Sequence, residues 1–341
     1  MTRRGDEQMH RNDGTAETFA LGDVVLESGE TLAGGVLGYR CAGALSEARD
    51  NCVLLFTYYT GTDASYEPWI GPGRALDPDR HFIVVVDHLG GGVSSSPSNV
   101  ADAGAFPRID VADTVSAARA LLVHLGVRHV ALAAGWSLGG IHALEFAASH
   151  PGLVSSVLAV CSAARCAPIN RVFLDGVESA LAADPDLAVA DPQRPPLAGL
   201  DAFGRVYAGW AYSEQFFAER IYEQFGYADA GHVLAEWGRD HQRMHAGDLL
   251  ASLRMWRQAD IGAARGGTER ALAGLDARTI LMPSTTDRYF TVAENRWEAE
   301  HLPNGFLRAL DSPLGHIAGR PGIREQEQEQ VDECLRELVD G

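Results

Sequence analysis

The sequence is poor in basic residues and has no long apolar run. Its 28 Lys and Arg residues are outnumbered by 46 Asp and Glu residues, which gives a formal net charge of −18. Nucleic acids and anionic membrane surfaces bind basic patches, so we expect neither as a partner. No apolar run approaches the roughly 18 residues that a transmembrane helix needs, so we expect no membrane-spanning segment.

Cysteine is also scarce, and its pattern excludes a disulfide-stapled fold. The chain has five cysteines, an odd number, and their spacing matches no zinc-binding or redox motif. We therefore expect reduced thiols and no metal site. Residues 1–18 are polar and lack the apolar centre of a signal peptide. We expect them to form a flexible N-terminal tail, and we expect the protein to be cytoplasmic.

What the sequence does contain is an alternation of short apolar runs with helical patterns, which is typical of a mostly parallel sheet flanked by helices. Hydrophobic residues make up 46% of the chain, enough for a large core. Strands are predicted at residues 18–27, 34–41, 52–56, 81–86, 129–134, 153–160, 278–282 and 305–310. Helices are predicted between them, at residues 110–125 and 138–149, and at the end of the chain, at residues 323–339.

Residues 168–265 differ from the rest, because they hold helical patterns, many aromatic residues and no convincing strand. We interpret this segment as a helical lid inserted into the α/β core, and call it the helical insertion. The core then comprises residues 19–167 and 266–341, preceded by the tail of residues 1–18.

A candidate nucleophile lies in Gly135-Trp136-Ser137-Leu138-Gly139, which fits the pattern G-x-S-x-G. A chain with 37 glycines can contain this pattern by chance, so its context matters. Here a predicted strand runs into it and a predicted helix follows, as in a nucleophile elbow. The alternative is a tight glycine turn that happens to contain a serine.

A serine nucleophile needs a base and an acid, which follow it in the chain order Ser, acid, His when it lies on such an elbow. His316 lies in the loop between the last strand and the last helix, and Asp287 follows the strand before. Asp311 is a rival acid, but it is too near His316 on the same loop. Asp287 could instead be a helix N-cap, and His88, at the end of a central strand, is interpreted as a packing residue.

The developing oxyanion needs backbone N–H donors. The amide after the nucleophile, that of Leu138, is one candidate, and the amide of Tyr59 in the loop after residues 52–56 is the other.

Several segments together resemble the homoserine O-acetyltransferase-like branch of the α/β hydrolases, especially its esterase members. They are Thr57-Tyr58-Tyr59-Thr60-Gly61, residues 89–97, Gly135–Gly140, Gly315-His316 and residues 248–261. The resemblance covers about residues 18–340. It implies the α/β-hydrolase fold, a Ser137–Asp287–His316 triad, a lid that forms a tunnel to the serine, and no metal or bound cofactor. In the transferases it implies acetyl-CoA or another acyl-CoA as co-substrate.

The chain departs from the homoserine enzymes at two places. These enzymes carry an acidic residue directly after the catalytic histidine, and this chain has Ile317 there. An apolar side chain cannot pair with the ammonium group of homoserine. Trp136, inside the elbow, would narrow or shape the acyl pocket. Tyr58, Trp136, Trp210 and Ile317 are our candidate substrate-binding residues.

Two activities share one acyl-enzyme. If water enters, the protein hydrolyses an ester, thioester or amide, and if an amine or hydroxyl is positioned instead, it is an acyltransferase. Ile317 and the esterase-like segments favour the hydrolase. A third possibility is a non-enzymatic receptor on the same fold, which an intact triad argues against. We expect a small-molecule acyl substrate and consider a homodimer possible.

Overall fold

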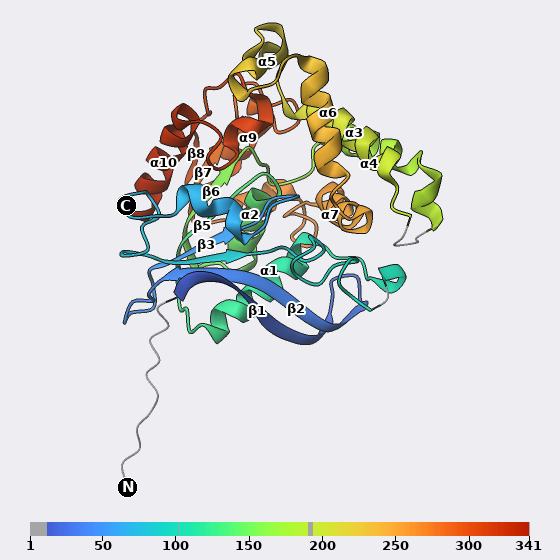
Figure 1. Cartoon of the computed structure of the whole chain (residues 1–341). Coiled ribbons are helices and arrows are strands. Elements are labelled where there is room, and N and C mark those ends of the chain that lie inside the picture. Colours follow the sequence, from blue (N-terminus) through green and yellow to red (C-terminus); the bar gives the residue numbers. More distant parts are fainter. Residues whose placement is uncertain (1–11, 102, 190–193, 341) are drawn as a thin grey trace.

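The computed structural model describes residues 12–101, 103–189 and 194–340 (Figure 1). The described strands form one eight-stranded sheet in the order β1-β2-β4-β3-β5-β6-β7-β8. β1 pairs with β2, and β2 with β4, in antiparallel fashion, and all other pairs are parallel. The strands are β1 (Asn12–Val25), β2 (Thr31–Gly43), β3 (Cys52–Phe56), β4 (Phe82–Val86), β5 (Val130–Trp136), β6 (Val154–Val160), β7 (Arg278–Met282) and β8 (Gly305–Leu307).

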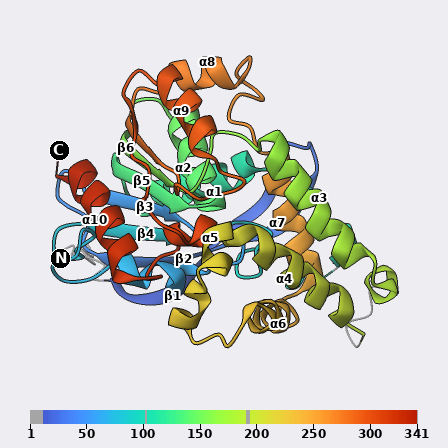
Figure 2. The ribbon, with the colours of Figure 1, turned by 90° about the horizontal axis from the view of Figure 1, so that it is seen from above.

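The central strands are parallel and covered on both faces, which explains their continuous apolar sequences. Every residue of β3 and β4 is buried. α2 (Leu138–Ser149) packs against β3, β5 and β6, and α1 (Val111–His124) packs against α2. α10 (Glu325–Val339) packs against β5 and β6 from the other face (Figure 2). The predicted α/β-hydrolase fold, with a mostly parallel sheet flanked by helices, is confirmed.

The predicted N-terminal tail was too long. Residues 12–18 belong to β1 and pair with β2, so the prediction is wrong for them, and residues 1–11 lie outside the described residues. The side chains of residues 15–18 are exposed, and the strand is held here by backbone pairing. A search for apolar runs therefore begins the strand too late.

Between β6 and β7 the described residues form helices and no named strand. They are α3 (Pro168–Ala182), α4 (Leu197–Ala211), α5 (Glu214–Ala218), α6 (Ala230–His241), α7 (Ala246–Gln258) and α8 (Thr268–Ala273). In Figure 1, α5 lies at the top, and α3, α4, α6 and α7 lie to the right of strands β3–β8. α9 (Val292–His301) follows β7. None of the helices in the described part of the chain is both long and apolar enough to span a membrane.

Candidate active site

Ser137 lies on the turn between β5 and α2 and has an unusual backbone conformation. Its φ is 58° and its ψ is −126°, outside the regions that L-residues ordinarily occupy. The turn is crowded. A Cβ atom on Gly139 would lie 2.1 Å from the carbonyl oxygen of Phe56, and one on Gly135 would lie 2.3 Å from the carbonyl carbon of Gly139. The glycines of the motif are therefore required by close backbone contact, as expected of a nucleophile elbow.

Hydrogen bonds hold this strained turn in place. The Ser162 hydroxyl donates to the carbonyl oxygen of Ser137 at 2.7 Å. The buried Tyr66 hydroxyl donates to the carbonyl oxygen of Phe56 at 2.7 Å and accepts from the Trp136 amide at 2.9 Å. Tyr66 thus joins the end of β3 to the end of β5, and fixes the loop after β3 relative to Ser137. Backbone strain of this kind persists only where surrounding contacts over-determine it.

The structure brings the three predicted triad side chains together. His316 Nε2 lies 3.0 Å from Ser137 Oγ, and His316 Nδ1 lies 2.7 Å from Asp287 Oδ2. All three residues are buried. With Nδ1 donating to the carboxylate, Nε2 is left as the acceptor that faces the serine hydroxyl. The contacts therefore have the arrangement that lets an imidazole take the proton of Ser137.

Asp287 is fixed by its own backbone neighbours. Its Oδ1 accepts from the amides of Tyr289 and Phe290, each at 3.0 Å, so its Oδ2 is left to face His316. The rival acid, Asp311, is exposed, and its backbone amide and carbonyl bond to the Gln330 side chain, whereas His316 Nδ1 contacts Asp287. The N-cap of α9 is Thr291, not Asp287. The contacts of Asp287 thus favour its role beside His316 over that of a cap.

Aromatic rings enclose the His316 imidazole. The Trp136 ring stacks on it, with 5.0 Å between ring centroids and 28° between planes, and Tyr289 lies 4.5 Å away on centroids. Trp136 Nε1 also donates to the His316 carbonyl oxygen at 3.3 Å. Trp136 therefore contacts the candidate base as well as the pocket. The sequence prediction missed Tyr289, although its position two residues after Asp287 was a usable signal.

The backbone amides of Tyr59 and Leu138 are the predicted oxyanion donors. Among the hydrogen bonds of the described residues, none is donated by the amide of Tyr59 or that of Leu138. Leu138 begins α2, so its amide is one of the unpaired donors of a helix N-terminus, where the helix dipole favours negative charge. The Tyr59 side chain is held by a hydrogen bond from its hydroxyl to the Leu249 carbonyl oxygen at 3.1 Å.

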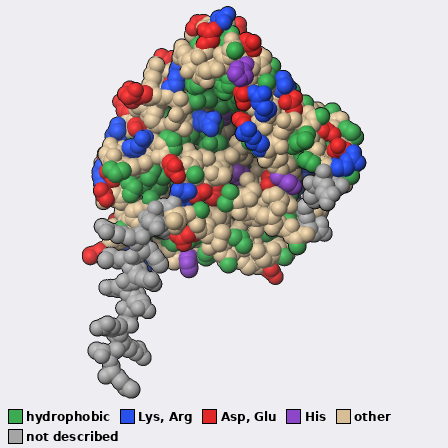
Figure 3. Space-filling view, viewed as in Figure 1, with side chains coloured by type: hydrophobic (Ala, Val, Ile, Leu, Met, Phe, Trp, Pro, Cys, Tyr) green, Lys and Arg blue, Asp and Glu red, His purple; other side chains and the backbone are tan. Residues whose placement is uncertain are grey.

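A cavity of about 310 Å³ opens above Ser137. Tyr58, Trp136 and Ile317, three of the predicted substrate-binding residues, line it. Most of its other lining residues come from the helical insertion or the loop after β3, and they are Tyr59, Thr60, Ser65, Tyr207, Tyr212, Tyr227, Trp237, Asp240, His241, Met244, His316 and Arg320. Figure 3 shows the molecular surface hollowed on this side, below α5, with hydrophobic side chains in the hollow.

Trp210 is not among the residues that line the cavity, so the structure does not bring it together with the other three predicted substrate-binding residues. Its ring packs against Phe173 and lies 5.2 Å beneath the Arg288 guanidinium. Helical spacing of aromatic residues does not reveal which side of α4 faces the cavity, and Tyr207, one turn earlier, is the residue that lines it.

The predicted packing role of His88 is consistent with its surroundings. It is buried between the hydroxyls of Thr57 and Ser252, at 2.9 and 3.1 Å, and does not line the cavity. Burial lowers the pKa of His88 to about 3, so the ring is neutral near pH 7.

Cys161 Sγ lies close to the triad and, with Asp287 and His316, offers ligand atoms within 4.8 Å of one another. This trio does not fit a metal ion well. His316 Nδ1 and Asp287 Oδ2 are already bonded to each other, and burial raises the pKa of the Cys161 thiol, which disfavours the thiolate that binds metals.

Comparisons with known proteins agree with this geometry. The model of the α/β hydrolase fold family matches residues 59–213. Ethyl acetate hydrolase of Pseudomonas veronii is 30% identical over 337 residues, which cover 96% of each chain. A homoserine O-acetyltransferase of Thermobifida fusca is 31% identical over 348 residues, covering 92% of this chain and 90% of that protein. The solved structure of the acetyl esterase MekB superposes with a TM-score of 0.92 at 30% identity, covering 96% of this chain and 97% of that one.

These relatives confirm the resemblance on which the sequence prediction rested. The chain is an enzyme that belongs to the α/β-hydrolase superfamily, in the branch that contains both esterases and homoserine O-acetyltransferases.

Proposed function

We propose that the protein is a serine-dependent hydrolase of small esters that works through an acyl-enzyme on Ser137. The observation that carries the proposal is the continuous contact from Ser137 Oγ through His316 to Asp287 at the floor of the cavity. The names ethyl acetate hydrolase and acetyl esterase, found in matches over nearly the whole chain, support an ester as substrate.

In the first half-reaction, Ser137 Oγ attacks the ester carbonyl carbon while His316 Nε2 takes the hydroxyl proton. The Asp287 carboxylate holds the imidazole in the required tautomer and stabilises the imidazolium. The carbonyl oxygen becomes an oxyanion, for which the amides of Leu138 and Tyr59 are the donors. The imidazolium then returns its proton to the departing alkoxide, the carbon–oxygen bond to the alcohol breaks, and the acyl group stays on Ser137.

The second half-reaction repeats these steps with water. His316 Nε2 removes a proton from a water molecule, whose oxygen attacks the acyl carbon through a second oxyanion. The bond to Ser137 Oγ breaks, the serine recovers its proton from His316, and a carboxylic acid leaves. No cofactor is needed in either half.

The cavity favours small, uncharged groups near Ser137. Its volume of about 310 Å³ is at the lower end for small-molecule sites. Trp136 and Ile317 present apolar surface beside the triad, so an ammonium group placed against Ile317 would lose hydration there without gaining a partner from that side chain. We therefore propose a short acyl chain and a small neutral alcohol as the two parts of the substrate.

Acyl transfer from acetyl-CoA or another acyl-CoA to a small amino acid or natural-product acceptor is the second candidate. The homoserine O-acetyltransferase relative, which matches most of this chain, favours it. The acyl-enzyme would be the same, and the helical insertion, acting as a lid, would decide whether water or an acceptor reaches it. The apolar Ile317 weighs against homoserine itself as the acceptor.

The two candidates are separated by intact-protein mass spectrometry. The protein is mixed briefly with p-nitrophenyl acetate or with acetyl-CoA, and Ser137→Ala is the control. An esterase releases p-nitrophenol continuously, and acetyl-CoA leaves no adduct. A stable acetyl adduct from acetyl-CoA, absent in Ser137→Ala, would favour the transferase. Equal ester turnover by Ser137→Ala would overturn the proposal of a Ser137 acyl-enzyme.

A further inference from the structure

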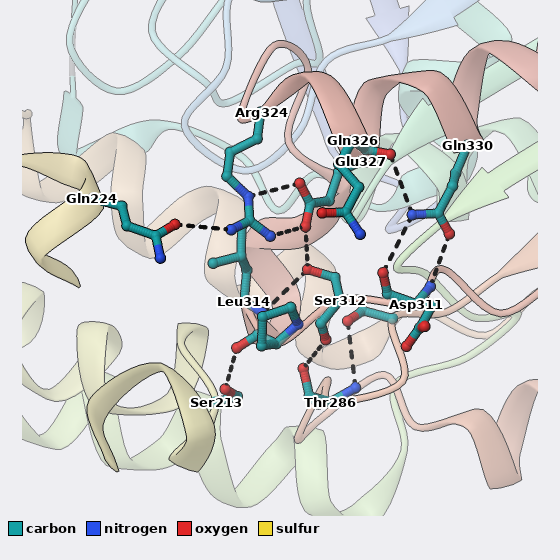
Figure 4. A network of polar contacts seen from close by, with 12 residues as sticks. Ser213, Gln224, Thr286, Asp311, Ser312, Leu314, Arg324, Gln326, Glu327 and Gln330 are labelled. Carbon is teal, nitrogen blue, oxygen red and sulfur yellow. Dashed lines mark hydrogen bonds and ion pairs between the residues drawn. The ribbon is translucent and has the colours of Figure 1, made fainter. Parts of the chain in front are cut away.

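The loop that carries His316 is held by a buried carboxylate from the last helix. Glu327 on α10 has no exposed surface, and its Oε1 accepts from the Ser312 hydroxyl at 2.7 Å. The same hydroxyl oxygen accepts from the Leu314 amide at 3.2 Å. Figure 4 shows this chain of contacts running from α10 to the peptide two residues before His316.

The charge of Glu327 sets the direction of these hydrogen bonds. Burial by itself raises the pKa of Glu327, but the Arg324 guanidinium and the Ser312 hydroxyl outweigh it and hold the pKa below its ordinary value. Arg324 Nε donates to Glu327 Oε2 at 2.8 Å, and Arg324 Nη2 contacts Oε1. An ionised carboxylate only accepts, so the Ser312 hydroxyl must donate to it. The lone pair of Ser312 is then directed at the Leu314 amide.

A second hydroxyl fixes the next peptide. Thr286, which directly precedes Asp287, accepts from the Gly315 amide at 2.9 Å and donates to the Ser312 carbonyl oxygen at 2.7 Å. The backbone amides of Leu314 and Gly315, the two residues before His316, thus each donate a hydrogen bond to a side-chain hydroxyl. One hydroxyl is oriented by Glu327, and the other belongs to the loop of the candidate acid.

The helical insertion supports the same loop from the opposite side. The buried Ser213 hydroxyl, at the start of α5, donates to the Pro313 carbonyl oxygen. Gly315 has a φ of 71°, and a Cβ atom there would lie 2.7 Å from the carbonyl oxygen of Ala211. The side chain of Gln224 in the same insertion also accepts from Arg324, at 3.4 Å (Figure 4). The loop is thereby held between α10, the acid loop and the helical insertion.

We propose that Glu327 is a positioning residue for His316 and acts through the Ser312 hydroxyl. The inference rests on the proposed function, because it assigns Glu327 a part in keeping His316 Nε2 within 3.0 Å of Ser137 Oγ. Neither Glu327 nor Ser312 lines the cavity, so their loss changes the placement of the base and leaves substrate binding almost intact. Displacing a catalytic group by about 1 Å costs on the order of 100-fold in rate, and a partly supported loop should lose less.

Glu327→Gln tests the proposal with almost no change of shape. The side-chain amide of this variant has two orientations. In one, its oxygen accepts from Ser312, but its NH₂ group lies against the Arg324 guanidinium. In the other, its NH₂ group faces the Ser312 oxygen and competes with the Leu314 backbone amide for it. We expect kcat for p-nitrophenyl acetate to fall about 10-fold with KM changed less than about 2-fold. Glu329→Gln, on an exposed position of the same helix, is the matched control and should match the unmutated enzyme.

Ser312 supplies the rescue test. Ser312→Ala should lower kcat about as much as Glu327→Gln, and Ser312→Thr, which keeps a hydroxyl, should recover most of it. The double variant Ser312→Ala/Glu327→Gln should be no slower than either single variant, because both changes break one chain of contacts. Thermal midpoints and circular dichroism establish that each variant is folded at the assay temperature.

A readout that does not depend on ester turnover separates this inference from the proposed function. The low-field proton NMR signal of the His316 Nδ1–H bonded to Asp287 should broaden or shift in Glu327→Gln and persist in Glu329→Gln. Unchanged kcat and an unchanged signal in folded Glu327→Gln would overturn the positioning role. So would a raised KM with constant kcat. If the unmutated protein shows the signal but hydrolyses no ester, the proposed function fails, and the NMR comparison still decides the role of Glu327.

Discussion

The indole of Trp136 stacks on the imidazole of His316 and donates its N–H to the carbonyl oxygen of the same residue. Trp136 also borders Ser137 in sequence, so one side chain links the elbow of the candidate nucleophile to the loop of the candidate base. The stacking and the hydrogen bond have separable effects, since a phenyl ring retains part of the first and none of the second.

Trp136→Phe should therefore lower kcat less than Trp136→Ala does. Loss of one hydrogen bond of about 1 kcal/mol should lower kcat about 5-fold in Trp136→Phe. Loss of the ring as well leaves His316 without its stacking partner and enlarges the cavity. The kcat of Trp136→Ala should therefore fall roughly 50-fold or more, and this variant should accept longer acyl chains. Steady-state rates with acetate, butyrate and hexanoate esters check both expectations.

The control for these variants is Trp297→Phe on α9. Its ring contacts Arg165 and His301, not the triad, so its rates should equal those of the unmutated enzyme. Equal kcat in Trp136→Ala and the unmutated enzyme would show that the base needs no support from the indole.

The glycines of the elbow give a prediction about stability. Gly139→Ala places a methyl group where only 2.1 Å separates it from the Phe56 carbonyl oxygen, inside a buried turn. Such overpacking should cost at least about 3 kcal/mol of unfolding free energy, or prevent folding. Gly176→Ala is the matched control, because the added methyl meets nothing within 4 Å and lies in the middle of α3. It should stabilise the protein by about 0.5–1 kcal/mol in urea unfolding.

The central part of the fold was predictable because burial leaves a clear pattern in its sequence. The bounds predicted for β3, β7 and α2 are those of the structure. Continuous apolar runs mark strands that are covered on both faces, and chain order then places a serine, an acid and a histidine after the carboxyl ends of strands in one sheet. At the sheet edges this signal fades. β1 begins at Asn12 instead of residue 18, and β8 ends at Leu307 instead of residue 310.

The support of the site was less predictable, because it depends on contacts between residues distant in sequence. Nothing near Glu327 in the sequence indicates that its carboxylate meets Ser312. Likewise, helical spacing places Tyr207 and Trp210 one turn apart on α4, but only the folded structure shows that Tyr207 lines the cavity while Trp210 packs beneath the Arg288 guanidinium. Residue type identified the reacting groups, while tertiary packing selects their supporting neighbours.

Ile317 gives a prediction about specificity. Ile317→Asp places a carboxylate in an apolar part of the cavity, directly after His316. The rate constant kcat/KM for neutral acetate esters should fall at least about 10-fold, since a charge must be desolvated beside the triad. For esters that carry an ammonium group, kcat/KM should fall much less, because the ammonium group can pair with the new carboxylate. Ile317→Asn, which has nearly the same shape and no charge, should show no such preference, and an equal loss for both ester types in Ile317→Asp would contradict the prediction.

The pH dependence of stability should depend on Glu298. Its side chain is fully buried on α9, and its Oε1 accepts from the Ala164 amide at 2.7 Å. Burial raises the pKa of Glu298 from 4.5 to about 8. Between these values the native state binds a proton that the unfolded chain has lost, so the free energy of unfolding falls as pH rises. The contribution of Glu298 to the free energy of unfolding is fully present below about pH 4.5. It is lost progressively as pH rises toward 8, at up to about 1.4 kcal/mol per pH unit.

Glu298→Gln removes this titration and keeps a neutral group with an acceptor for Ala164. Its thermal midpoint should therefore fall less between pH 5 and pH 8 than that of the unmutated protein. Some decline should remain, because burial also raises the pKa of Asp87, to about 7, and this carboxyl loses its proton in the same range. Glu300→Gln, exposed on the same helix, should keep the full slope. Parallel curves for Glu298→Gln and the unmutated protein would mean that Glu298 is ionised in the native state throughout this range.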